Sequence, residues 1–404
     1  MELMELEREN MCLIGASSMD DWVSYQKTSN SKEELQVVLL THPRDETDLP
    51  RLLPWSEHLT MQDRRALTRI LMPVFGEIIK TPTLNAGILF LPMYADEMIN
   101  PRTRAHCRKV LEETALEIAA RAGAKMICLG GLTGALSLYG RRLLVKANEL
   151  GLQITTGHSM TAVSVLRTYL RALDDLRIDH ARATMTVIGV GSIGGSFTQL
   201  LARQRRRPAR IVLVDTPSRA DHVRRYAEQL QADCGIGVEV EFTSPAGALP
   251  IDSAAYRSRF VISAVSTANI IDIDRVAPGT VLIDDSQPYC WSRQSAWARV
   301  HARQDIAPCE AGLIDCSSIG YRSRFSFDFA DQDETGESST SWSCMAEGLL
   351  RVVAPDLPPT IGEPCIDNLL AYDEAFGKCG LKVPALQCGN HKLPIDEIRK
   401  HFSA

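Results

Sequence analysis

The sequence has no apolar segment long enough to cross a membrane as a helix. The longest candidate, residues 86–95, is interrupted by Pro92, whereas a spanning helix needs about 18 or more apolar residues in succession. The chain opens Met-Glu-Leu-Met-Glu-Leu-Glu and so lacks the basic residues with which a secretory signal begins. From these absences we expect a cytoplasmic protein that does not span a membrane.

Excess positive charge and ordered cysteine spacing are also missing. The formal net charge is -6, the wrong sign for attracting nucleic acid, so we expect no DNA partner. The eleven cysteines have no regular spacing, which indicates reduced thiols and not a disulfide framework. Cys365, Cys379, Cys388 and His391 could be combined into a zinc site, but only the last two have ligand-like spacing. We therefore expect no metal centre.

The length and the order of apolar segments predict an α/β protein of several domains. With 404 residues, the chain exceeds the roughly 250–300 at which a single core stops growing. Residues 1–34 are polar and predict an irregular or helical extension. We then predict strands at 35–40, 87–91 and 126–129, alternating with helices at 61–79, 101–122 and 136–150. This alternation is typical of a parallel sheet, and we place an N-terminal α/β substrate domain at 1–157 and a connecting helix at 158–178.

The most informative motif is a G-x-G-x-x-G turn between a strand and a helix, at residues 185–195. Gly189 permits a tight turn, Gly191 lets the backbone approach a pyrophosphate, and Gly194 allows helix and strand to pack closely. Further strands are predicted near 211–214, 238–242, 260–264 and 280–284. We therefore predict a Rossmann dinucleotide-binding domain at 179–310, the alternative being a glycine turn without a ligand.

Residues after the first glycine predict how the dinucleotide is held. Ser192 and Ile193 begin the helix whose N-terminus would face the phosphates. Asp215 ends the second strand, where a carboxylate accepts hydrogen bonds from the ribose of NADH and repels the 2′-phosphate of NADPH. Arg219 could still reach that phosphate, so the cofactor is NADH or NADPH, with NADH favoured. Small residues after the fourth strand can also lie beside the cofactor, and they include Ser266 and Thr267.

Two glycine turns of the first domain, residues 130–134 and 154–161, are candidates for the substrate wall. Loops at the carboxyl ends of strands are where α/β folds bind ligands. The second turn contains His158, Ser159 and Thr161, which are candidates for acid–base chemistry or for stabilising an oxyanion. The alternative is structural: the two hydroxyls could cap the following helix, and the histidine could be exposed to water.

Cys344 has the most distinctive surroundings of the thiols. It falls in the first turn of an amphipathic helix within a C-terminal helical segment, residues 311–404. If Ser341 is the N-cap, the helix dipole and the free amides at this end favour a thiolate, and Gly348 would leave room above the sulfur. A small buried apolar cysteine is the alternative. The acidic stretch at 325–340 predicts a mobile loop before the helix.

Five arginines between Arg203 and Arg210 are a local exception to the acidic charge. They are either the solvated end of a helix and its loop, or a docking site for an acidic partner.

Several short motifs occur together and in order, and they are Phe90-Leu91-Pro92, Leu129-Gly130-Gly131-Leu132-Thr133, Thr155-Thr156-Gly157 with Thr161-Ala162, the glycine turn at 187–194, Val281-Leu282-Ile283-Asp284 and Cys344-Met345-Ala346-Glu347. In these motifs the chain resembles the long-chain acyl-(acyl-carrier-protein) reductases of the cyanobacterial type, which turn a carrier-bound acyl thioester into an aldehyde. The resemblance covers residues 85–390 approximately. It implies that Cys344 is the acyl-accepting cysteine and that the glycine turn holds the cofactor.

The chain departs from that family at two positions. The family has a histidine where this chain has Met160, and His158 lies two places earlier, which leaves its acid–base role open. The family generally uses NADPH, with an arginine near the position of Asp215.

Taken together, the residues and the resemblance predict an NAD(P)H-dependent reductase of acyl or aminoacyl thioesters that works through a covalent thioester on Cys344. The expected partners are the acyl thioester, an acidic carrier protein and further copies of the chain itself. The alternatives are an NAD(P)-dependent dehydrogenase of small hydroxy or amino acids without a covalent intermediate, and a non-catalytic nucleotide-binding regulator.

Overall fold

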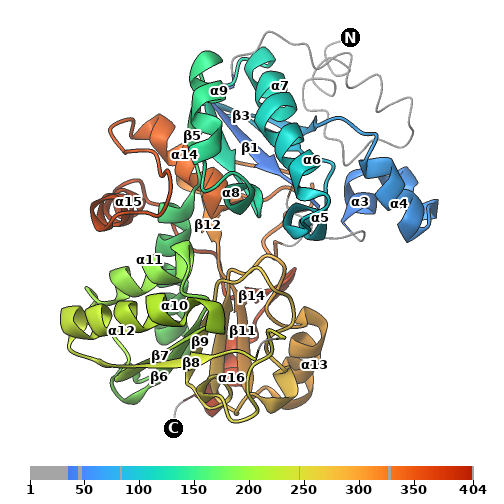
Figure 1. The fold of residues 1–404 in the computed structure, drawn as a ribbon. Coiled ribbons are helices and arrows are strands. Elements are labelled where there is room, and N and C mark those ends of the chain that lie inside the picture. Colours follow the sequence, from blue (N-terminus) through green and yellow to red (C-terminus); the bar gives the residue numbers. More distant parts are fainter. Residues whose placement is uncertain (1–34, 44–47, 82–83, 245, 326–328, 403–404) are drawn as a thin grey trace.

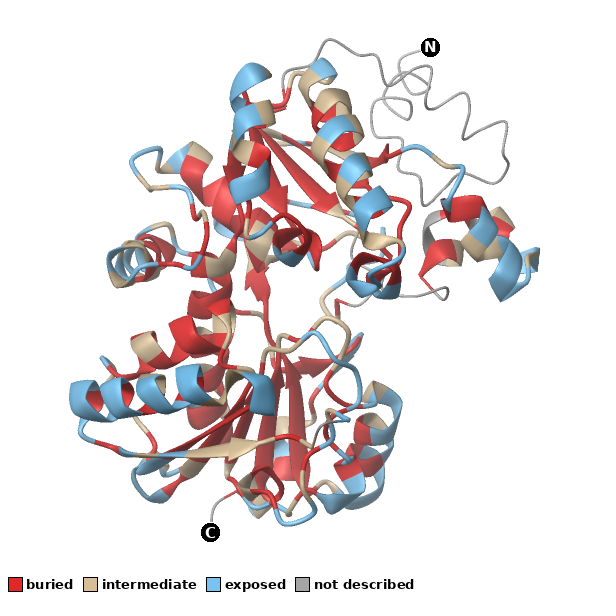
Figure 2. Ribbon diagram, in the orientation of Figure 1, coloured by how far each residue is buried: buried red, intermediate tan, exposed pale blue. Residues whose placement is uncertain are grey.

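The computed structural model describes residues 35–43, 48–81, 84–244, 246–325 and 329–402. The predicted N-terminal extension at 1–34 lies outside the described residues. The chain is a mixed α/β protein with two main sheets, each flanked by helices, and the two stand one above the other in Figure 1. The central strands of both sheets are buried, the edge strand β8 (Gly237–Phe242) is partly exposed, and the outward faces of the flanking helices are exposed (Figure 2).

The first sheet has five strands in the order β2-β3-β1-β4-β5. Their bounds are β1 Val37–Thr41, β2 Val74–Lys80, β3 Asn85–Phe90, β4 Met126–Leu129 and β5 Gln153–Thr155. Four of them run parallel, as predicted, and β2 pairs antiparallel with β3 at the edge. The helices of this part are α3 Leu49–Leu52, α4 Met61–Thr68, α5 Ala95–Ile99, α6 Arg104–Lys109, α7 Leu116–Arg121, α8 Thr133–Leu136 and α9 Leu144–Glu149.

The helix predicted over residues 61–79 is wrong in its second half. Helix α4 ends at Thr68, and strand β2 begins at Val74 directly after Pro73. Proline cannot continue a helix, and it favours an extended residue before it. The apolar residues beyond it are buried against β3, a partner that helical spacing alone does not reveal.

The second sheet has six parallel strands in the order β11-β10-β9-β6-β7-β8. The predicted strands of this domain are confirmed as β6 Thr184–Ile188, β7 Arg210–Asp215, β8 Gly237–Phe242, β9 Phe260–Ser263 and β10 Thr280–Asp284, joined by β11 Ile306–Glu310. Helices α11 Ser192–Leu201, α12 Ala220–Cys234 and α13 Arg293–Arg303 cover its two faces (Figure 1). This strand order is that of the Rossmann fold, in which ligands bind beyond the carboxyl ends of the strands.

Helix α10, His158–Leu176, connects the two sheets, and the chain later returns to the first one. After β12 (Leu313–Asp315) and β13 (Thr340–Trp342), helix α14 (Ser343–Val353) packs on β1 and β4. Gly348 makes this packing close, because a Cβ there would lie 2.3 Å from Cys128 Sγ. The predicted role of Gly348 was therefore wrong: it faces the sheet and not the sulfur of Cys344. The chain ends with α15 Ile366–Lys378, β14 Gln387–Cys388, β15 His391–Lys392 and α16 Ile395–Ile398.

In the part of the chain that the structure describes, no helix combines the length and the apolar character needed to cross a membrane.

Candidate active site

A cavity of about 500 Å³ lies between the two sheets, beyond the carboxyl ends of their strands. Its walls include the ends of β1 and β4, the glycine turn after β6, the loops that follow β7, β9 and β10, and the first residues of α14. Gly191 and Cys344 therefore line the same cavity although they are far apart in the sequence. This position is where α/β folds place their ligands.

The glycine turn has the shape that a bound dinucleotide requires. A Cβ on Gly189, whose φ is +88°, would meet Ala264 O at 2.4 Å, and a Cβ on Gly194 would meet Gly189 O at 2.0 Å. At Gly191, by contrast, the nearest atom to an added Cβ is Arg219 Nη1 at 4.0 Å. Gly189 and Gly194 are thus required by the packing of the protein itself. Gly191 keeps open a space that a pyrophosphate fills in this fold, so the residues present fit a dinucleotide.

Most of the other predicted cofactor residues line the cavity. Ser192, Ile193, Ser266 and Thr267 all face it, whereas Gly194 lies beneath the turn and does not. Ser192 is the first residue of α11, so its side chain stands at the N-terminus of the helix.

Asp215 and Arg219 form an ion pair at the edge of this site. Arg219 Nη1 lies 2.9 Å from Asp215 Oδ2, and the same oxygen accepts a hydrogen bond from Val190 N at 3.0 Å. The other oxygen accepts one from Thr216 N at 2.7 Å. The carboxylate is therefore already engaged by the protein and partly neutralised by the guanidinium, so its predicted repulsion of a 2′-phosphate is weakened.

Cys344 is held between two glycine turns of the first sheet. A Cβ on Gly157, whose φ is +74°, would lie 2.3 Å from the Cα of Cys344, and one on Gly130 would lie 3.6 Å from its Sγ. Gly130 follows β4 and Gly157 follows β5. The absence of side chains at these two positions lets α14 bring the thiol to the ends of the parallel strands.

The predicted cap and ionisation of Cys344 are both corrected by the structure. Trp342, and not Ser341, is the N-cap of α14, and Ser341 belongs to strand β13. Cys344 is therefore the second helical residue. Burial and, to a lesser extent, the nearby Asp285 carboxyl raise the pKa of its thiol to about 12, although the Met345 N–H favours the thiolate. The helix N-terminus does not overcome these effects, so the resting group is a thiol.

His158 also lines the cavity, as a neutral ring at the start of α10. Its Nδ1 lies 2.8 Å from Ser192 Oγ, and its ring makes an edge contact with Tyr139 at 5.5 Å. Burial lowers the pKa of His158 to about 4. The histidine therefore bridges the connecting helix and the dinucleotide turn, and it is not the water-exposed residue of the structural alternative.

The two hydroxyl candidates have different positions. Thr161 lines the cavity, and its Oγ1 lies 2.7 Å from Ser343 Oγ, beside the nucleophile candidate. Ser159 is fully buried, lies 2.7 Å from Thr360 Oγ1, and does not line the cavity. Neither residue caps α10, because the N-cap is Gly157 in a left-handed conformation. This placement gives no support to a catalytic role for Ser159.

Two carboxyls near Cys344, the buried Glu347 and the half-buried Asp285, were not among the predicted site residues. Glu347 accepts hydrogen bonds from Thr155 Oγ1 and, at 3.0 Å, from Met160 N, so it ties α14 to the end of β5 and the start of α10. Asp285 follows β10 and lines the cavity. The pair of acids closing that strand was visible in the sequence, and both line the cavity, but nothing local shows which of them lacks a hydrogen-bond partner.

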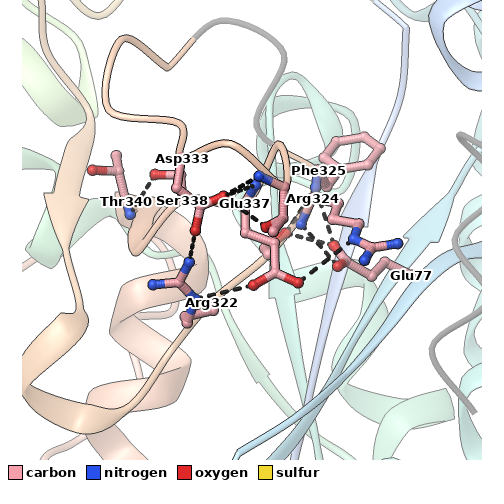
Figure 3. Close-up of polar contacts among 10 residues, drawn as sticks. Glu77, Arg322, Arg324, Phe325, Asp333, Glu337, Ser338 and Thr340 are labelled. Atoms are coloured by element: carbon pink, nitrogen blue, oxygen red, sulfur yellow. Dashed lines mark hydrogen bonds and ion pairs between the residues drawn. The ribbon is translucent and has the colours of Figure 1, made fainter. Parts of the chain in front are cut away.

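A polar network around Glu77 and Arg322 holds the segment that contains Phe325 (Figure 3). Glu77 of β2 accepts hydrogen bonds from Arg324 N at 2.9 Å and Phe325 N at 3.2 Å, and Phe325 lines the cavity. Arg322 pairs with Asp333 and Glu337. The stretch predicted to be a mobile loop is thus held by hydrogen bonds at Phe325, at Ala330 and over residues 333–340, while its residues 326–328 lie outside the described residues.

The arginine-rich segment lies away from the cavity. It follows the C-terminal end of α11 and leads into the start of β7. The amino ends of the strands lie there, at the end of the sheet opposite to the glycine turn. Arg206 pairs with Asp174, and Arg210 pairs with Glu239. A carrier docked on this segment would not face Cys344, so the structure gives no support to the docking role.

Among the described residues, no three histidine, cysteine, aspartate or glutamate side chains gather as a metal site requires.

The comparisons with known proteins are remote. The chain matches no family model. It is 24% identical over 207 residues to the aminotransferase PigE of Serratia sp. (strain ATCC 39006), a match that covers 51% of this chain and 22% of that protein. The chain thus spans about a fifth of the curated relative it matches.

Two solved structures show the same kind of likeness. The L-tryptophan dehydrogenase of Nostoc punctiforme is 10% identical, with 87% of this chain and 81% of that chain covered and a TM-score of 0.39. The Delta(1)-pyrroline-2-carboxylate reductase of Thermococcus litoralis, solved with NADH and L-proline, is 19% identical over 31% of this chain and 36% of that one, with a TM-score of 0.24. Similarities this low do not assign an activity.

Proposed function

We propose that the protein is an NAD(P)H-dependent reductase that converts acyl or aminoacyl thioesters to aldehydes through a covalent thioester on Cys344. The observation that carries the proposal is that the dinucleotide turn and the Cys344 thiol line one cavity. The resemblance to the acyl-(acyl-carrier-protein) reductases supports the same chemistry, because Cys344 stands at that family's acyl-accepting position.

The residues that line the cavity would have different roles in this reaction. Cys344 would take the acyl group from the thioester, which gives an enzyme thioester that remains activated toward reduction. The dinucleotide, held at Gly191 and Ser192, would supply the hydride. Amides at the start of α14 would stabilise an oxyanion on the acyl group. The hydroxyl of Thr161 donates to Gly157 O at 2.9 Å and lies 2.7 Å from Ser343 Oγ, so it would have to turn from Gly157 to join them.

The acyl group would extend toward the first sheet. On that side the cavity is lined by apolar side chains, namely Leu39, Phe90, Leu129, Leu132, Ala135 and Phe325. An apolar wall excludes water, which would otherwise hydrolyse an enzyme thioester. An acidic carrier protein stays part of the proposal, without the arginine segment as its docking surface.

The test is acylation without the cofactor. The intact protein, incubated with a panel of acyl thioesters of coenzyme A, N-acetylcysteamine and a carrier protein, should gain the mass of one acyl group on Cys344. Addition of NADH or NADPH should then release aldehyde and restore the original mass. Aldehyde formation without any acylated protein would contradict the covalent route.

The second candidate is a dehydrogenase that reduces the carbonyl or imine of a small hydroxy or amino acid precursor directly. The raised pKa of Cys344 favours it, because a resting thiol is a weaker nucleophile than a thiolate. This enzyme would need neither Cys344 nor a thioester. A nucleotide-binding regulator, the third candidate, would bind the dinucleotide and turn nothing over.

We do not carry over the activity in the name of the Serratia relative. An aminotransferase that uses pyridoxal phosphate needs a lysine for the Schiff base, and the described residues that line the cavity include no lysine.

A further inference from the structure

Asp285 is a cavity carboxyl with an unusual environment. It lines the cavity directly after β10, and no residue that the structure describes donates a hydrogen bond to its side chain. Its neighbour Asp284 accepts hydrogen bonds from Ser263 Oγ at 2.7 Å, Ser286 N at 3.0 Å and Cys290 N at 2.9 Å. The Asp285 carboxyl is half-buried and faces the cavity without a partner among the described residues. It is therefore free to contact a bound substrate.

Gly312 brings this carboxyl to the first turn of α14. The position that a Cβ would take on Gly312 lies 2.4 Å from Asp285 Oδ1 and 3.6 Å from Ser343 Oγ. Gly312 O also accepts a hydrogen bond from Ser343 N at 2.7 Å. Because Ser343 immediately precedes Cys344, the acid that follows β10 lies beside the first turn of α14, and its carboxyl is close enough to Cys344 to influence the pKa of the thiol.

The two adjacent carboxyls differ in their ionisation. Burial, together with the charge of Asp284, raises the pKa of Asp285 well above its ordinary value, while burial raises that of Asp284 to about 6. Asp284 accepts three hydrogen bonds, which favour its charged form, whereas Asp285 accepts none from a described residue, so a proton is favoured on Asp285. Neighbouring acids whose pKa values are pushed apart are a pattern typical of acid–base assignments.

The other titratable groups around the cavity leave this assignment intact. Glu310 of β11 is paired with Arg293 at 3.0 Å. Burial lowers the pKa of His158 on α10, so its ring is neutral. Burial raises the pKa of Glu347 on α14.

We propose that Asp285 is the proton relay for the attack of Cys344 on the thioester, an inference that rests on the function proposed above. The bond from Cys344 Sγ to the carbonyl carbon forms, and the bond from that carbon to the carrier sulfur breaks. The thiol proton passes to one oxygen of Asp285 while the proton on its other oxygen passes to the leaving sulfur. Asp285 ends protonated, as it began, and no ion has to form in a site where burial penalises charge.

The relay explains how Cys344 could act as a nucleophile although its thiol is protonated near neutral pH. With a pKa raised to about 12, the thiol of Cys344 supplies almost no thiolate near neutral pH. A neutral acid that accepts one proton while donating another removes the need for a preformed thiolate.

The experiment measures acylation of Cys344 by hexanoyl-coenzyme A in single turnover, without a nicotinamide cofactor, by intact mass across neutral pH. Asp285→Asn should slow acylation by about 10²–10³-fold, within the range that a positioned acid–base group contributes. The wild-type rate should hardly change with pH. The rate of the variant should rise about tenfold per pH unit, because only preformed thiolate can then attack.

Two controls separate the relay from damage to the fold. Glu239→Gln removes an exposed carboxyl of the same sheet outside the cavity and should acylate within a few-fold of wild type. Unchanged melting temperature and dinucleotide affinity show that Asp285→Asn is folded. As a second readout, the infrared band of a protonated carboxyl near neutral pH should be present in wild type and lost in Asp285→Asn.

The outcomes are distinguishable. If wild type is acylated and Asp285→Asn is acylated at the same rate with the same pH profile, the relay is wrong and the proposed function stands. An infrared spectrum in which Asp285 is ionised at neutral pH also overturns the relay. If no thioester acylates wild type, the proposed function fails and the relay fails with it.

Discussion

Replacing Gly157 by alanine should displace Cys344, because the added methyl group would overlap the backbone of that residue. Gly157 has a φ of +74°, and the added Cβ would lie 2.3 Å from Cys344 Cα and 2.6 Å from Cys344 Cβ. Real Cβ atoms do not approach backbone so closely, and no change of rotamer relieves a contact with Cα. Either α14 or the turn before α10 must move.

The magnitude follows from two separate costs. A left-handed conformation costs an alanine about 1–2 kcal/mol, and forcing a methyl group into a packed region costs about 1–3 kcal/mol more. Gly151 is a matched control, because its φ is +69° and an added Cβ meets nothing within 4 Å. Gly151→Ala should therefore lose only the conformational cost, so the two variants should differ by about 1–3 kcal/mol.

Urea unfolding of both variants gives this difference, and alkylation of Cys344 reports the displacement. Gly157→Ala should alter the alkylation rate of Cys344, while Gly151→Ala should leave it at the wild-type value. Equal losses of stability in the two variants, with the reactivity of Cys344 unchanged in both, would refute the close approach of Gly157 to the thiol.

Three further predictions concern the cofactor and pH. Gly191→Ala should keep the fold, because an added Cβ has no neighbour closer than 4.0 Å. It should weaken dinucleotide binding at least about tenfold, or about 1.4 kcal/mol. An unchanged affinity in a fluorescence titration would count against the site. Asp215→Ala should raise the ratio of kcat/KM for NADPH over that for NADH, and Arg219→Ala should lower this ratio. The two paired side chains carry opposite charges, so they act in opposite directions on the 2′-phosphate of NADPH. Shifts of the ratio in the same direction would contradict this. Burial lowers the pKa of His158 from 6.5 to about 4, so the unfolded chain binds the proton more readily and stability should fall as pH drops through this window, by at most about 3 kcal/mol. His158→Gln should flatten that slope in denaturation curves measured at each pH, and an unchanged slope would show that His158 is not the group responsible.

The Rossmann half of the molecule could be predicted because its signals are local. The spacing of Gly189, Gly191 and Gly194, and the apolar runs on either side, specify a strand, a turn and a helix within a few residues. The helix predicted over 61–79 failed because the apolar residues after Pro73 pack on β3, a contact between distant parts of the chain.

The properties of the site itself depend on such distant contacts. The position of Cys344 was predictable from its motif, but the pKa of its thiol depends on burial between two sheets and on Asp285, which belongs to the other domain. Gly348 was misread because only the fold shows that it faces Cys128. The place of Asp285 at the end of a predicted strand could be read from the sequence, but its lack of a hydrogen-bond partner could not.

The central claim is that Cys344 carries the acyl group, and aldehyde formation by Cys344→Ala tests it most directly. The variant should keep its melting temperature and dinucleotide affinity, while both acylation and aldehyde formation are lost. Cys344→Ser should be nearly as inactive, because a serine ester is a poorer hydride acceptor than a thioester. Cys365→Ala, which removes an exposed thiol outside the cavity, should be as active as wild type. Aldehyde production from a thioester by Cys344→Ala at close to the wild-type rate would contradict the covalent route, and direct reduction by a dehydrogenase would take its place.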